Sequence, residues 1–97
     1  MSRIYTHFPG GVVTIGWDRT LHTSGWWGDV LLDSDETPSI EVPEDYPFTL
    51  LPDIAAVIRA LGPYGHIVPG EAVAAAIAFP DRNTTMHFTS ETTPDTP

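Results

Sequence analysis

An acidic, proline-containing segment at residues 33–47 divides the sequence into two halves with different hydrophobic patterns. Before this segment, apolar and polar residues mostly alternate, which is the period of a half-buried β-strand. After it, apolar residues recur at a spacing of three and four, which is typical of an amphipathic helix. Three prolines in the segment remove three backbone donors and so disfavour a central strand there. The order of the two patterns predicts an α+β fold.

The N-terminal half predicts a β-hairpin over residues 3–17, with the turn at Pro9, Gly10 and Gly11. A third strand is expected at residues 26–32. The polar stretch 18–25 lies between them and is interpreted as a loop. Within the acidic segment, a short edge strand at Ile40–Val42 remains an open alternative to a surface loop.

The C-terminal half predicts a helix that ends at Gly62 and Pro63, with Thr49 as its N-cap. A second helix is expected from about Pro69 to Phe79, followed by a turn at residues 80–83 and a last strand at residues 84–89. The apolar stripe of the first helix consists of Leu50, Ile54, Val57, Ile58 and Leu61.

These elements predict one domain at residues 1–89, with an acidic loop at 33–47 and a polar tail at 90–97 that frays. The expected architecture is a small single α+β domain. Its antiparallel sheet contains the N-terminal hairpin and one or two further strands, and an αα-hairpin packs on one face.

The charge balance excludes several kinds of partner. The 97 residues include 13 carboxylates, 4 arginines and no lysine, which gives a formal net charge of −9. The electrostatic field of such a negative chain repels phosphate, so we expect no direct binding to nucleic acid or to an anionic membrane.

The absence of cysteine excludes disulfides and thiolate chemistry. No secretory leader is recognisable, and we expect a cytoplasmic protein. The use of arginine alone as the basic residue is typical of a high-GC genome.

Histidines offer the only pattern that points to an enzyme, and that signal is weak. They are scattered, with no metal-binding spacing, and the sequence has no nucleophile elbow or phosphate-binding loop. No catalytic residue, metal ligand or cofactor is therefore predicted. The alternative is an enzyme subunit that depends on a metal or small ligand. In it, His7 and His87 would face each other on adjacent strands and share a sheet-side pocket with Asp29 or Asp18.

Trp26 and Trp27 are adjacent in the predicted third strand, so their side chains must point to opposite faces of the sheet. Two alternatives follow. One indole is exposed and anchors a partner, or both are buried beneath the polar stretch 18–25 and the acidic segment.

The acidic segment is the strongest functional signal. It contains six carboxylates and no basic residue, and an uncompensated negative surface attracts a cationic partner over a long range. We therefore expect a non-enzymatic module that binds a protein with a basic surface. It would act as an inhibitor or accessory factor of the kind that mobile elements carry, and it would form a homodimer. A purely structural, self-assembling domain is the third alternative. The residues expected to bind are Trp26, Trp27, Asp35, Glu36, Glu41, Glu44 and Asp45.

Overall fold

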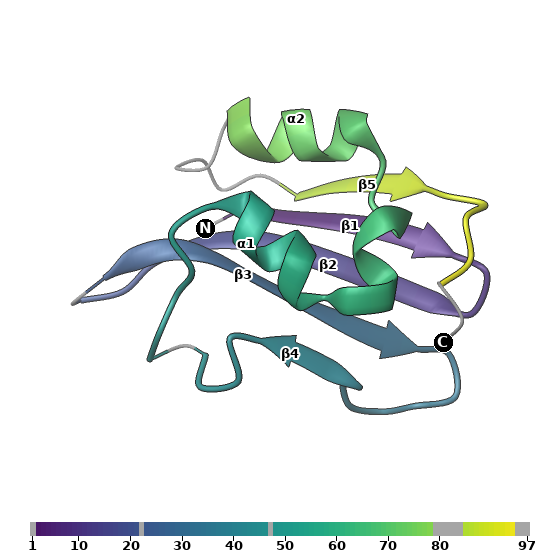
Figure 1. The fold of residues 1–97 in the computed structure, drawn as a ribbon, viewed down its shortest axis with the longest axis horizontal. Helices are drawn as coiled ribbons and strands as arrows, with labels where there is room; N and C mark the ends of the chain where they lie inside the picture. Colours follow the sequence, from purple (N-terminus) through teal and green to yellow (C-terminus); the bar gives the residue numbers. More distant parts are fainter. Residues whose placement is uncertain (1, 22, 47, 79–84, 95–97) are drawn as a thin grey trace.

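A computed structural model describes residues 2–21, 23–46, 48–78 and 85–94. Within these residues, one five-stranded sheet has the order β4-β3-β2-β1-β5, and the helices cover one of its faces (Figure 1). The strands are β1 (Ser2–Phe8), β2 (Gly11–Arg19), β3 (Ser24–Leu32), β4 (Ile40–Val42) and β5 (Thr85–Thr89). The helices are α1 (Ile54–Ala60), the 3₁₀-helix η1 (Gly62–Ile67) and α2 (Gly70–Ala78). The predicted α+β class is confirmed.

The N-terminal hairpin is formed by β1 and β2, as predicted, with Ile4 opposite Ile15. Gly10 in its turn has a φ of 116°, a conformation that side chains with a Cβ rarely adopt. The interpretation of residues 18–25 as a loop is wrong at both ends of the stretch, where four of its eight residues belong to strands. There β2 and β3 continue their antiparallel pairing as far as Arg19 and Ser24, and Thr20 N–H donates to the Thr23 carbonyl at 2.7 Å.

Both edge strands of the sheet lie in segments whose secondary structure the sequence pattern predicted less clearly. The short strand at Ile40–Val42 forms as β4 and pairs antiparallel with β3. At the other edge β5 pairs with β1 in parallel, so the expected purely antiparallel sheet is wrong at this strand. The direction of β5 is set by the connection that precedes it in the chain. The chain crosses the sheet through three helical segments and enters β5 in the same direction as β1.

The hydrophobic core lies between the sheet and the helices, because alternate residues of each strand point to that side. Its fully buried side chains include Val13 and Ile15 of β2 and Val57 of α1. Ala72 and Ala76 of α2 are also buried. Their small side chains let this helix pack against the sheet, so these two alanines serve the core.

The first helix begins four residues later than its apolar stripe suggested. Asp53, and not Thr49, is the N-cap, and its carboxylate accepts a hydrogen bond from Ala56 N–H at 2.8 Å. Leu51 is extended instead, and it exchanges two backbone hydrogen bonds with Trp26. This bridge holds residues 49–52 against the sheet and delays the helix.

The second helix and the last strand agree with their predicted ranges where the structure describes them. The helix α2 lies inside the predicted range, whereas Phe79, the turn at 80–83 and Thr84 fall outside the described residues. Residues 90–94 of the tail contact the domain. Ser90 N–H donates to the His7 carbonyl at 2.8 Å, and the His66 ring nitrogen bonds the Thr93 carbonyl at 2.8 Å. Among the described helices, none has the length and apolar character to cross a membrane.

Candidate functional site

In the described part of the chain, no helix covers the face of the sheet opposite α1 and α2 (Figure 1). Every second residue of each strand points to this side, since successive side chains alternate between the two faces. We call this surface the open face. Its polar, charged and aromatic residues include Arg3, Tyr5, His7, Thr14, Trp27, Asp29, Glu41 and His87.

Trp27 forms an aromatic platform on the open face. Its indole lies over Gly16, where a Cβ atom would stand 2.4 Å from the ring. Tyr46, from the acidic segment, covers the indole with a ring-centroid distance of 5.1 Å, and the Arg3 guanidinium lies 5.8 Å from the indole centroid. As a result, only 6% of Trp27 is exposed although it faces away from the helices.

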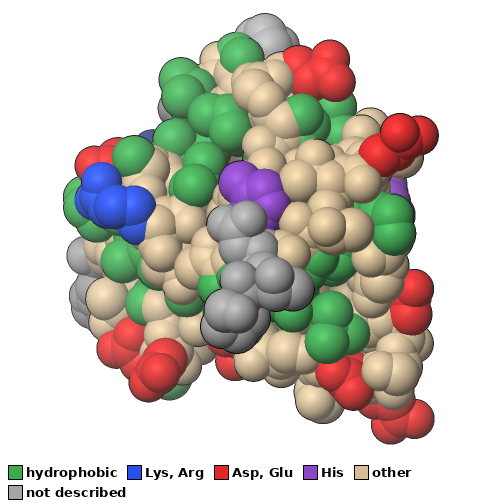
Figure 2. Space-filling view, turned by 45° about the vertical axis from the view of Figure 1, so that its right-hand side comes forward, with side chains coloured by type: hydrophobic (Ala, Val, Ile, Leu, Met, Phe, Trp, Pro, Cys, Tyr) green, Lys and Arg blue, Asp and Glu red, His purple; other side chains and the backbone are tan. Residues whose placement is uncertain are grey.

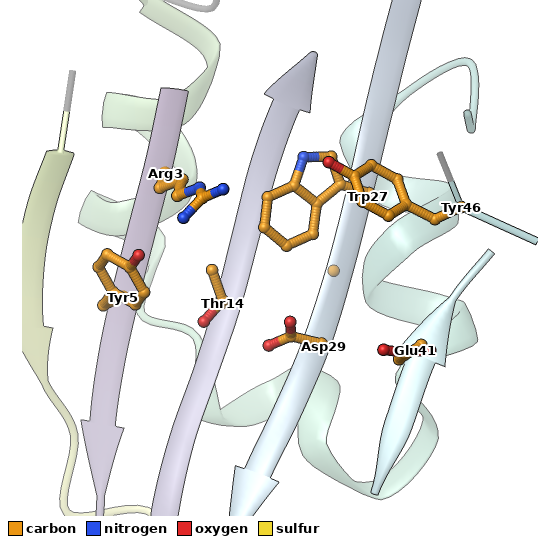
Figure 3. Close-up of a pocket in the computed structure, with 8 residues that line it drawn as sticks. Arg3, Tyr5, Thr14, Trp27, Asp29, Glu41 and Tyr46 are labelled. Atoms are coloured by element: carbon orange, nitrogen blue, oxygen red, sulfur yellow. The ribbon is translucent and has the colours of Figure 1, made fainter. Parts of the chain in front are cut away.

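Beside this platform is a depression of about 210 Å³, which we call the charged pocket (Figure 3). An adjoining hollow of about 360 Å³, the apolar hollow, shares Tyr5, Thr14 and Asp29 with it. The charged pocket is lined by Arg3, Tyr5, Thr14, Trp27, Gly28, Asp29, Glu41 and Tyr46. The apolar hollow adds His7, Val12, Leu31, Pro38 and His87.

Two carboxylates face each other in the charged pocket. Asp29 of β3 is in register with Glu41 of β4, so the two like charges lie on adjacent strands. Partial burial raises the pKa of Asp29 above its usual value of 3.8, and the charge of Glu41 raises it further. A hydrogen bond from Thr14 and the charge of Arg3 act in the opposite direction and lower it. The ionised form of Asp29 is therefore less stable than that of an exposed aspartate, and a cation beside it would stabilise the ionised form.

Tyr46 connects the acidic segment to the end of β2. Its hydroxyl donates to an Asp18 carboxylate oxygen at 3.2 Å. Burial raises the pKa of Tyr46 above 10.0, and the negative charge of Asp18 raises it further. The phenol thus stays protonated and keeps its ring over Trp27.

His7 and His87 face each other across β1 and β5, as one sequence-based alternative expected. His7 Nε2 lies 2.9 Å from His87 Nδ1, and the two rings are stacked. His87 also stacks on Tyr5, and Asp29 lines the same apolar hollow as both histidines. The residues that the structure describes contain no group of three or more histidine, cysteine or acidic side chains placed to hold a metal ion.

Trp26 and Trp27 point to opposite faces of the sheet, as predicted. Both are buried, with exposed fractions of 9% and 6%, so the alternative with an exposed indole is wrong. Trp26 belongs to the core beneath the helices, and Trp27 is covered by Tyr46 and Arg3. An exposed indole was one expectation because the core of a small domain has little room for both tryptophans. The acidic segment instead folds over part of the open face, where its Tyr46 covers Trp27.

The carboxylates expected to bind a partner are all exposed. Glu41 reaches the charged pocket, whereas the other four lie on the surrounding surface of the acidic segment. Two of those four accept local hydrogen bonds, Asp35 from Ser39 and Asp45 from Thr49. On the face shown in Figure 2, acidic side chains recur around the rim while basic side chains are confined to one place.

Five pocket residues were missed by the sequence-based reasoning: Arg3, Tyr5, Thr14, Gly28 and Tyr46. The alternation along β1 carried a usable signal, because it places Arg3 and Tyr5 on the same side as His7. No comparable signal marks Tyr46, which reaches the site through a non-local loop. No family model, curated protein or solved structure matches this chain.

Proposed function

We propose that this chain is a non-enzymatic interaction module that binds a protein with a basic surface and acts as an inhibitor or accessory factor. The observation that carries the proposal is the exposure of all six carboxylates of residues 33–47. Within the described residues none of the six forms an ion pair. An exposed carboxylate loses little hydration when it meets a cation at the rim of an interface, so the segment favours association.

Electrostatic steering is the expected mechanism. A net charge of −9 on a molecule with a radius of gyration of 12.5 Å produces a field that extends beyond its surface at low salt. Steering raises the association rate more than it raises the affinity, and salt screens it. Binding should therefore weaken as ionic strength increases.

Glu36 and Glu44 provide the cleanest test, because neither side chain makes a hydrogen bond within the described structure. Three chains would serve as baits in a native lysate. They are the wild type, the double variant Glu36→Gln/Glu44→Gln, and a matched control, the double variant Glu71→Gln/Glu91→Gln. The control removes the same charge from two exposed positions outside the acidic segment.

We expect one basic protein to be captured at low salt by the wild type and by the control, with several-fold less captured by the first variant. The partner should be depleted at high salt. Equal capture by both double variants would contradict a role for the acidic segment. Recovery of the chain alone would contradict the basic partner and support self-assembly instead.

A ligand-dependent enzyme subunit is a second candidate. The observation that favours it is that His7, His87 and Asp29 line one hollow. Metal analysis of protein purified without a histidine tag tests its metal-dependent form. Stoichiometric zinc, manganese or iron lost in His7→Ala would support this candidate, and a well-folded, metal-free protein would contradict its metal-dependent form.

A further inference from the structure

Three charged side chains line the charged pocket, and they come from three different strands. Arg3 is on β1, Asp29 is on β3 and Glu41 is on β4. Among the described residues, none of the three is in an ion pair. Arg3 instead lies over the ring of Trp27, and Asp29 accepts from Thr14. The pocket therefore contains charged groups that no ion pair between described residues neutralises.

These charges are separated by sign. The strand β2 lies between Arg3 and the two carboxylates, and its pocket residue Thr14 is uncharged. Because neighbouring strands are about 4.8 Å apart, the backbones that carry Arg3 and Asp29 are separated by roughly 10 Å. Figure 3 shows the guanidinium at one side of the pocket and the carboxylates of Asp29 and Glu41 at the other.

A ligand with a single charge would fit this arrangement poorly. A simple cation beside the carboxylates would leave Arg3 without a counter-ion, and a simple anion at Arg3 would lie near two carboxylates. A zwitterion satisfies both sides, since its carboxylate can accept from the guanidinium while its ammonium donates to Asp29 and Glu41. The raised pKa of Asp29 would also return toward its usual value beside an ammonium group.

The dimensions of the site limit the size of the ligand. A volume of about 210 Å³ corresponds to roughly seven water molecules at about 30 Å³ each. The adjoining apolar hollow presents Val12, Leu31 and Pro38, which suit a hydrocarbon side chain. We propose that the charged pocket binds a small zwitterion, an apolar α-amino acid whose side chain enters the apolar hollow. The proposed site shares Glu41 with the acidic segment but does not require the proposed basic partner.

The test is an NMR titration of the ¹⁵N-labelled chain with free glycine, valine, leucine, methionine and phenylalanine. We expect saturable shifts at the amides of Arg3, Thr14 and Asp29, with tighter binding for leucine than for glycine. No saturable shift at these amides with any of the five, up to about 10 mM, would overturn the proposal.

Leucinamide and N-acetylleucine separate the two ends of the ligand, because each lacks one of the two charges. Both should bind at least about tenfold more weakly than leucine, as expected for the loss of a charge-assisted hydrogen bond. If leucinamide binds as tightly as leucine, the pocket recognises a cation only, and the zwitterion proposal is wrong.

Variants assign each end to its residue. Arg3→Gln should abolish the preference for leucine over leucinamide, and Asp29→Asn with Glu41→Gln should abolish the preference for leucine over N-acetylleucine. Arg59→Gln is the matched control, because Arg59 is exposed on α1 on the other side of the sheet. The dispersion of the amide spectrum reports whether each variant is folded. Retention of both preferences in the folded pocket variants would contradict the assignment.

Discussion

At the scale of single residues, Gly16 determines the shape of the open face. A side chain there would occupy the space of the Trp27 indole, because a Cβ atom would stand 2.4 Å from two of its ring carbons. We therefore expect Gly16→Ala to displace the indole and to lower the free energy of unfolding by about 1–3 kcal/mol, as overpacking does elsewhere. Urea denaturation followed by circular dichroism measures this loss.

Gly70→Ala is the matched control. A Cβ at Gly70 meets nothing within 4 Å, and the residue is the first of α2. This substitution should leave stability unchanged or raise it by up to about 1 kcal/mol. If Gly16→Ala were as stable as Gly70→Ala, the platform would be less tightly packed than the structure indicates.

Asp29 should make stability depend on pH. Because folding raises its pKa above 3.8, the folded chain binds this proton more tightly than the unfolded chain does. The contribution of Asp29 to the free energy of unfolding is therefore most favourable below pH 3.8 and decreases as pH rises through the raised pKa.

Asp29→Asn removes this dependence and retains an acceptor for the Thr14 hydroxyl. We expect the variant to be at least as stable as the wild type at pH 7, with an advantage that shrinks as the pH is lowered to about 4. Unfolding free energies at the two pH values measure the difference. An advantage that grows on acidification would show that burial does not dominate at this carboxyl.

At the scale of elements, α1 depends on its N-cap because it contains only seven residues. Asp53→Ala removes the acceptor for Ala56 N–H and should cost about 1 kcal/mol. Asp53→Ser should recover most of this loss, since a serine hydroxyl also accepts at an N-cap. Thermal unfolding of the three chains measures both effects. Equal losses in the two variants would mean that the carboxylate acts mainly through its charge.

The elements also show what the sequence could predict. Local patterns were sufficient for the first hairpin and for both α-helices, because alternation and helical spacing are properties of neighbouring residues. They failed where a distant strand decides the outcome. Leu51 lies inside the range predicted as helix but pairs with Trp26 in the structure, and β5 takes its parallel direction from the path of the preceding helices.

The site was predictable in part for the same reason. The contact between His7 and His87 could be predicted because alternation places both side chains on the same face of two strands that are neighbours in the sheet. The opposite directions of Trp26 and Trp27 could be predicted because the two residues are adjacent in one strand. Burial of Trp27 depends on Tyr46, which is 19 positions away and lies in a loop. No local pattern encodes that contact, so the charged pocket was not predicted.

At the scale of the whole molecule, the two faces of the sheet have different roles. The helices bury one face, and the other carries the acidic segment along its edge and charges that form no ion pair among the residues the structure describes. A field from −9 charges acts over about 30 Å at 0.01 M salt but only about 8 Å at 0.15 M. Under the proposed function, we expect the charge to guide a basic partner toward the molecule and the acidic segment to determine where that partner docks.

The most direct test of this account is to locate the partner on the chain. The ¹⁵N-labelled protein would be titrated with the captured basic partner, and amide signals would be followed at low and at physiological salt. We predict that the shifted amides are concentrated in residues 33–47 and that the affinity falls as salt increases. Shifts confined to the exposed surfaces of α1 and α2, with an affinity indifferent to salt, would contradict the proposed function.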